Sequence, residues 1–80
     1  MLKSITVQAE WHDAQKIWIA TSSDIWGLTA QALDLERLRA TVLPMIADLV
    51  ELNKVEVAGR DIPVHIVSTT THNLHLESVA

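Results

Sequence analysis

The spacing of apolar residues changes at Asp34 of this 80-residue chain, and the change determines what the chain can fold into. Before Asp34, short segments place apolar side chains at every second position, the period of a β-strand with one buried face. After Asp34 they recur at steps of three and four residues, the period of an amphipathic helix. A β-branched segment follows near the end. The pattern predicts an α+β fold with one helix packed on a sheet.

Three strand-like segments precede Asp34. The first, residues 5–11, carries its apolar side chains on one face: Ile5, Val7, Ala9 and Trp11. A short polar stretch then reverses the chain into residues 16–21, so the two segments predict a hairpin. Residues 16–21 have apolar groups on both faces, and we expect one face to meet the core and the other to be open to a partner. Residues 28–32 follow a turn cluster and complete a three-stranded meander.

Asp34 is a favourable N-cap, which predicts a helix that begins at Leu35. The helix would bury one broad stripe of apolar residues: Leu35, Leu38, Val42, Met45, Ile46, Leu49, Val50 and Leu52. Pro44 lies inside this pattern and removes an amide donor, at a cost of about 3 kcal/mol in an ideal helix interior. Because the periodicity continues in phase beyond Pro44, we expect one kinked helix that ends near Asn53.

Residues 62–71 are rich in β-branched side chains and predict a final strand, with Pro63 suited to its beginning or to a sheet edge. Leu74 to Leu76 alternate again, which leaves open whether they extend this strand or form a hairpin. Residues 1–80 are therefore expected to form a single domain with the order β-β-β-α-β. A single-layer sheet with one uncovered face, or a long edge strand, favours self-association as a homodimer or a larger assembly.

Composition and charge exclude several classes of protein. The net charge is −4 and the six basic residues are scattered singly, so no cluster is available for direct nucleic-acid binding. An acidic surface instead suits a basic protein partner. No apolar run approaches the roughly 20 residues of a membrane span, and the N-terminus has no signal pattern. Together with the absence of cysteine, this predicts a cytoplasmic protein.

The sequence carries no recognisable catalytic or cofactor-binding set. His72 and His75 are three residues apart, but in a strand they would point to opposite faces, and no cysteine or carboxylate trio completes a metal shell. We therefore interpret the spacing of the two histidines as a coincidence without function. A metal-dependent enzyme that uses both histidines is the less favoured alternative. Neither a nucleophile elbow nor a phosphate loop is present. We therefore expect a protein without enzymatic activity, cofactor or bound metal.

Three tryptophans supply all the aromatic content. Tryptophan fills small cores and is also enriched at binding hot spots. Trp11 lies on the predicted buried face of its strand and is expected to fill the core. Trp18 points away from its apolar strand neighbours, and Trp26 lies in a turn. Trp18 and Trp26 are therefore the candidate partner-binding residues.

The order of several segments resembles the HicB-like antitoxin pattern of a strand, an aspartate-x-x-glycine turn, a strand and a capped helix. The matching segments are Trp18-Ile19-Ala20, Asp24-Ile25-Trp26-Gly27-Leu28 and Asp34-Leu35-Glu36-Arg37-Leu38. Two later segments are similar to a small set of bacterial HicB-related domains of unknown function: Leu43-Pro44-Met45-Ile46-Ala47-Asp48-Leu49 and Ile62-Pro63-Val64. The chain differs from the usual family turn in having Trp26 where proline often precedes the glycine.

The resemblance implies a partial RNase H-like sheet whose last strand runs parallel beside the first. It implies an antitoxin that binds and occludes a small basic mRNA-cleaving toxin. No added DNA-binding segment follows the final strand in this sequence, so regulation of an operon by this chain alone is not expected. The alternative function is that of an orphan domain that self-associates or senses a small ligand.

Overall fold

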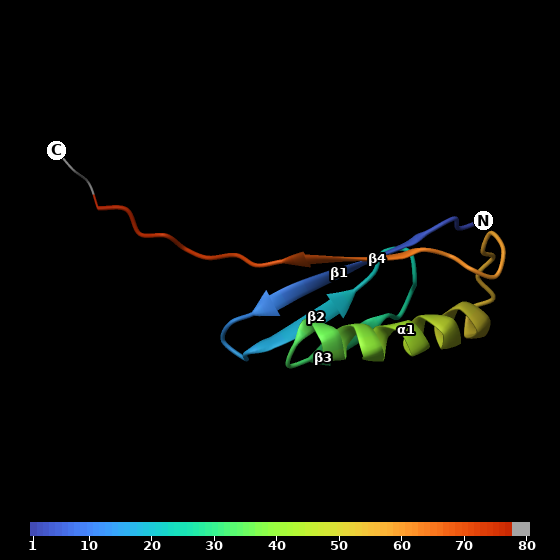
Figure 1. Cartoon of the computed structure of the whole chain (residues 1–80), viewed down its shortest axis with the longest axis horizontal. Coiled ribbons are helices and arrows are strands. Elements are labelled where there is room, and N and C mark those ends of the chain that lie inside the picture. Colours follow the sequence, from blue (N-terminus) through green and yellow to red (C-terminus); the bar gives the residue numbers. More distant parts are fainter. Residues whose placement is uncertain (78–80) are drawn as a thin grey trace.

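The computed structural model describes residues 1–77, which form one four-stranded sheet and one helix (Figure 1). The elements in chain order are β1 (Ile5–His12), β2 (Ile17–Thr21), β3 (Thr29–Ala32), α1 (Leu35–Leu52) and β4 (Val64–Thr69). The predicted α+β class and the order of the elements are both confirmed.

The sheet has the strand order β3-β2-β1-β4. The first three strands form the predicted antiparallel meander, in which Trp11 pairs with Trp18, and Trp18 with Ala32. β4 pairs in parallel with β1, starting from Ile5 opposite Val64. The expectation that the last strand lies parallel beside the first is therefore confirmed, and β3 and β4 are the two edges of the sheet.

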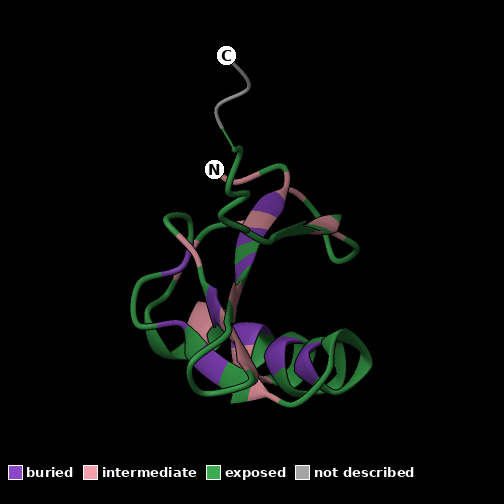
Figure 2. Ribbon diagram, turned by 90° about the vertical axis from the view of Figure 1, so that its left-hand side faces the viewer, coloured by how far each residue is buried: buried purple, intermediate pink, exposed green. Residues whose placement is uncertain are grey.

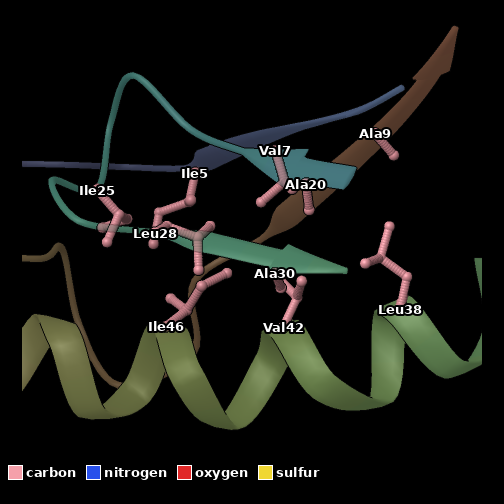
Figure 3. Close-up of a cluster of buried hydrophobic side chains, with 10 residues drawn as sticks. All are labelled: Ile5, Val7, Ala9, Ala20, Ile25, Leu28, Ala30, Leu38, Val42 and Ile46. Carbon is pink, nitrogen blue, oxygen red and sulfur yellow. The ribbon is translucent and has the colours of Figure 1, made fainter. Parts of the chain in front are cut away.

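The core lies between α1 and one face of the sheet (Figure 3). A row of small side chains crosses this face, because Ala9 pairs with Ala20 and Ala20 with Ala30. Leu38, Val42 and Ile46 of the helix point toward the sheet, and Figure 3 shows Val42 beside Ala30. The remaining members of the core come from β1 and the β2–β3 loop: Ile5, Val7, Ile25 and Leu28.

Both helix ends have a recognisable cap. The carboxylate of Asp34 accepts a 2.7 Å hydrogen bond from the backbone N–H of Arg37, as expected for an N-cap. The helix continues through Pro44 without restarting. At the other end, the N–H of Val55 donates to the carbonyl of Val50, and that of Lys54 to Glu51. These two bonds form a Schellman motif with Lys54 in the left-handed conformation, at a φ of 52°.

The last strand is shorter than the 62–71 predicted from the sequence. β4 ends at Thr69, opposite Glu10, and β1 soon turns away into the β1–β2 connection. Residues 70–77 then run away from the body in an extended course without strand pairing to any described residue (Figure 1). In the single chain, Leu74 to Leu76 therefore neither lengthen the strand nor form a hairpin. We call residues 70–77 the C-terminal arm.

The helix does not cover the sheet evenly. α1 packs mainly on β3 and β2, whereas β1 and β4 extend past it. β4 consists of half-buried and exposed residues along its whole length (Figure 2). The opposite face of the sheet is open among the described residues and mixes threonine and glutamine with a few aliphatic side chains. The β4 side of the molecule therefore presents uncovered backbone and uncovered apolar surface.

Candidate protein-interaction site

The β2–β3 loop is fastened to β1 by two of its side chains. The last residue pair between β1 and β2 is Gln8 with Thr21, where β2 ends. The backbone groups of Thr6 therefore have no partner in β2. The N–H of Thr6 donates a 2.8 Å hydrogen bond to the Asp24 carboxylate, and the Thr6 carbonyl accepts a 2.6 Å bond from the Ser22 hydroxyl. Ser22 Oγ also accepts from the N–H of Asp24 at 3.1 Å. Side chains of the loop thus satisfy the backbone groups that a longer β2 would have paired.

The same loop is held on its other side by the core and the end of α1. Ile25 and Leu28 are buried, and Gly27 adopts a φ of 86°, which glycine reaches without a steric cost. The Asn53 amide donates a 3.3 Å hydrogen bond to the carbonyl of Trp26. The Trp26 side chain is nevertheless 83% exposed. The backbone of the loop is therefore restrained while its one aromatic side chain projects into solvent.

The loop that carries this tryptophan lies against a part of α1 that contains acidic residues. Gly27 approaches Leu49, so the loop lies against the last turns of α1. Leu52 is three residues after Leu49 and lies on the same side of the helix, and Asp48 is a helical neighbour of Leu52, four residues before it. The last turn of α1 contains no basic residue that would offset the negative end of the helix dipole. The carboxylates in this part of the helix therefore add to a negative local charge. Lys54, just after the cap, is the nearest cation in the sequence. We call Trp26, Asp24, Asp48 and Leu52 the Trp26 surface.

The structure does not bring the two candidate tryptophans together. Trp18 is half-buried near the start of β2, and its ring packs on Trp11 with centroids 5.5 Å apart and planes at 57°. Trp11 Nε1 also donates a 3.3 Å hydrogen bond to Asp13. Trp26 follows the opposite end of β2. Trp18 thus belongs to an aromatic pair on the helix-facing side of the sheet, away from the Trp26 surface.

An apolar groove lies on the other side of α1, between the helix and the beginning of β4. Its volume is about 320 Å³. The helix contributes Leu43, Ile46, Ala47 and Val50, and the sheet and the segment before β4 contribute Ile5, Val57, Arg60, Ile62 and Val64. The apolar stripe predicted from the sequence omitted Leu43 and Ala47. Their apolar character outside that stripe is the signal that could have indicated a second apolar surface.

The ionisable groups of residues 1–77 include one pair whose contacts shift a pKa and no cluster of the metal-binding type. No group of three or more histidine, aspartate or glutamate side chains in this range could hold a metal ion, and both His72 and His75 lie on the C-terminal arm. A hydrogen bond from Lys16 lowers the pKa of Asp13, with further contributions from the Trp11 hydrogen bond and the charge of Lys16. This pair lies in the exposed β1–β2 connection and stabilises that turn.

No helix in the part of the chain that the structure describes is long and apolar enough to cross a membrane.

Comparison with known proteins identifies relatives without an assigned activity. Residues 4–77 match the family described as "Domain of unknown function (DUF1902)". No significant match is found among curated proteins. The chain is 33% identical to a hypothetical protein, TTHA1013, from the extremely thermophilic bacterium Thermus thermophilus, whose crystal structure superposes with a TM-score of 0.67. That match covers 91% of this chain and 99% of the thermophile protein. By this extent of sequence and fold, the chain belongs to the DUF1902 family.

Proposed function

We propose that this domain is a non-enzymatic interaction module, a HicB-like antitoxin that binds and occludes a small basic mRNA-cleaving toxin through the Trp26 surface. The observation that carries the proposal is the combination at Trp26 of a restrained backbone and a side chain that is 83% exposed. A large exposed aromatic side chain on a restrained backbone is suited to anchoring a partner.

The restraint on the loop supports tight binding. Association loses free energy when a loop must be ordered on contact, and a loop that is ordered beforehand avoids this loss. Hydrogen bonds from Thr6 and Asn53 hold the segment on both sides of Trp26. Tryptophan is also among the residues that most often dominate interface energetics. The sequence segment from Asp24 to Gly27, which resembles the family turn, thus presents an anchor for a partner.

Charge supports a basic partner. A ribonuclease must attract the phosphates of its substrate and so carries a positive surface where RNA binds. Asp24 and Asp48 lie on the Trp26 surface, and the whole chain has a net charge of −4. An acidic protein surface would be drawn to the same face of the toxin that RNA uses. Inhibition then needs no chemistry from this domain, because its bulk covers the RNA-binding face.

The test is co-expression with each small protein encoded next to this chain in its source genome, followed by affinity measurement and an RNA-cleavage assay on any basic partner recovered. The wild-type domain should bind that protein and stop its cleavage of RNA. Trp26→Ala should raise the Kd by about 30-fold or more, as expected for a hot-spot residue. Leu33→Ala is the matched control, since Leu33 is also an exposed apolar residue but lies between β3 and α1.

Two results would overturn the proposal: failure of the wild-type domain to bind or inhibit the neighbouring protein, or equal binding by the Trp26 and Leu33 variants. Both variants change exposed side chains, so a matching thermal unfolding midpoint would show that the fold is intact.

A second candidate function is that of an orphan self-associating domain with no toxin. The apolar groove beside the β4 edge favours it, because a protein that works as a monomer gains nothing from leaving such a surface uncovered. Recovery of the domain alone in the same co-expression experiment, as a stable oligomer, would support this candidate.

A further inference from the structure

The single chain exposes far more surface than a compact domain of its size. Its accessible area is 6286 Å², against roughly 4800 Å² expected for a folded monomer of this mass. Its radius of gyration is 16.1 Å, against roughly 12 Å for a compact chain of this length. The C-terminal arm and the uneven cover of the sheet both contribute to the excess. The chain thus exposes about 1500 Å² more than a compact monomer of its mass.

The arm continues the side-chain alternation of β4. Val64 and Ile66 of β4 point to the helix side of the sheet, since they pair with the buried residues of β1. Leu74 and Leu76 have the same parity, so a strand that continued through the arm would place them on that side too. In the single chain they are 80% and 76% exposed. The arm thus carries two exposed leucines on the helix side of an extended strand, where they are suited to covering an apolar surface.

The outer edge of β4 lacks the lysine, acidic and proline residues that commonly prevent strand pairing. Residues 64–76 contain no lysine, arginine, aspartate, glutamate or proline. Natural edge strands are commonly protected by such residues. Two copies of this segment can therefore approach each other without repulsion between like charges. Edge-to-edge pairing between identical strands is compatible with the charge pattern of the arm.

The arm cannot reach the groove of its own chain while it remains extended. The groove lies at the beginning of β4, beside Val64 and Ile62, and the arm leaves from the end of the strand. Residues 70–77 contain neither glycine nor proline to turn the chain back. In an antiparallel pair, however, the end of one strand lies beside the beginning of the other. A second copy therefore brings its arm to the groove without any change of direction.

We infer that this chain forms a two-fold symmetric homodimer in which β4 and the C-terminal arm pair antiparallel with the same segment of a second copy, and Leu74 and Leu76 of each copy cover the apolar groove of the other. A two-fold axis at Thr70 pairs Ile66 with Leu74 and Val64 with Leu76. Directly opposite residues in an antiparallel pair share one face, so the leucines lie over the groove side. The two sheets become one continuous sheet of eight strands.

The area agrees with a stable dimer. Specific interfaces bury about 800 Å² on each partner, and the excess surface of this chain exceeds that value. The dimer also leaves the Trp26 surface open, because the groove and that surface lie on opposite sides of α1. The inference is therefore independent of the proposed toxin and can be tested without it.

The first experiment measures the mass of the full chain in solution at 1–100 µM by light scattering after size exclusion. The wild type should elute with twice the monomer mass. The double variant L74D/L76D should shift to the monomer mass, because each leucine becomes a charge facing an apolar groove. The variant L33D is the control and should remain dimeric, since Leu33 is exposed outside the proposed interface. All three proteins should unfold cooperatively.

The second experiment uses the absence of cysteine in the sequence. Thr70→Cys places one thiol at the proposed two-fold axis, and mild oxidation should produce a covalent dimer, since opposing strand positions match disulfide geometry. Thr29→Cys at the β3 edge should stay monomeric on a non-reducing gel. A monomeric wild type at 100 µM, a dimer that survives L74D/L76D, or rapid cross-linking at position 29 with none at position 70 would each overturn the inference.

Discussion

The backbone N–H of Thr6 and the carboxylate of Asp24 are joined by a 2.8 Å hydrogen bond across 18 residues of sequence. The bond ties the central strand to the loop that presents Trp26. The aspartate of the aspartate-x-x-glycine turn is therefore a positioning residue for that loop. Its effect on binding would combine the placement of Trp26 with its own charge, and its effect on the fold can be measured separately.

Asp24→Ala should lower the free energy of unfolding by about 1–2 kcal/mol, because the Thr6 amide loses a charged acceptor. Asp24→Asn should lose less, since an amide oxygen can still accept. The measurement is urea denaturation followed by tryptophan fluorescence. Asp48→Ala is the control and should not destabilise the fold, because Asp48 is exposed near the negative end of the helix dipole. Equal stability of D24A and wild type would contradict the assigned role.

Lys54→Gly should raise the free energy of unfolding by about 1 kcal/mol, because Lys54 adopts a φ of 52° where glycine has no side-chain penalty. Lys16 adopts a similar φ of 56°, but its ammonium also bonds Asp13 at 2.8 Å. Lys16→Gly should therefore gain less than Lys54→Gly. Thermal unfolding of the two variants compares them directly. A lower midpoint for K54G would show that the left-handed residue is not a source of strain.

The contribution of Asp13 to stability should depend on pH. Hydrogen bonding from Lys16 lowers the pKa of Asp13 in the folded state below its ordinary value of 3.8. A carboxyl group with a depressed folded pKa stabilises the fold above its unfolded pKa and loses this effect as the pH falls through the folded pKa. Asp13→Asn should be less stable than wild type at pH 7, by a small amount because the pair is exposed.

Urea denaturation at pH 7 and near pH 2 checks this expectation, and the two proteins should converge at the lower pH. Lys16→Met, which removes the partner of Asp13, should show the same convergence. A difference between D13N and wild type that persists unchanged at low pH would mean that the ion pair is not its cause.

Leu38→Ala should lower the free energy of unfolding by about 2–5 kcal/mol, since it leaves a cavity in a fully buried site. Folded domains are stable by only about 5–15 kcal/mol, so much of the stability should be lost. Leu33→Ala, on the exposed connection before α1, should change stability by less than about 0.5 kcal/mol. Circular dichroism during heating distinguishes the two. A small change in the free energy of unfolding of L38A would contradict the assignment of Leu38 to the core.

The sequence predicted the helix and the strands better than it predicted the exposed surfaces of the protein. Alternation in residues 5–11 and the cap at Asp34 are local signals, and β1 and α1 begin where they indicated. The end of β4 is not local, because a strand lasts only as long as a neighbour pairs with it. β1 turns away near Thr69, and no pattern within residues 62–71 contains that information.

The candidate site was predicted only in part for the same reason. Trp18 and Trp26 were both candidate partner-binding residues, and the structure exposes Trp26, whereas Trp18 is packed on Trp11 by a cross-strand register that sequence spacing did not specify. The groove also escaped prediction. Periodicity identifies the apolar residues of a helix, but it does not say which strands the helix will lie across.

The row of alanines has a consequence for how the groove can be altered. Ala20 and Ala30 are short side chains on the strands beneath α1, while Val64 and Ile66 stand taller on β4. The helix packs on the strands that carry these short side chains, β2 and β3. Enlarging Ala30 would push α1 sideways and change the width of the groove. The width of the groove thus depends in part on Ala20 and Ala30, which do not line it.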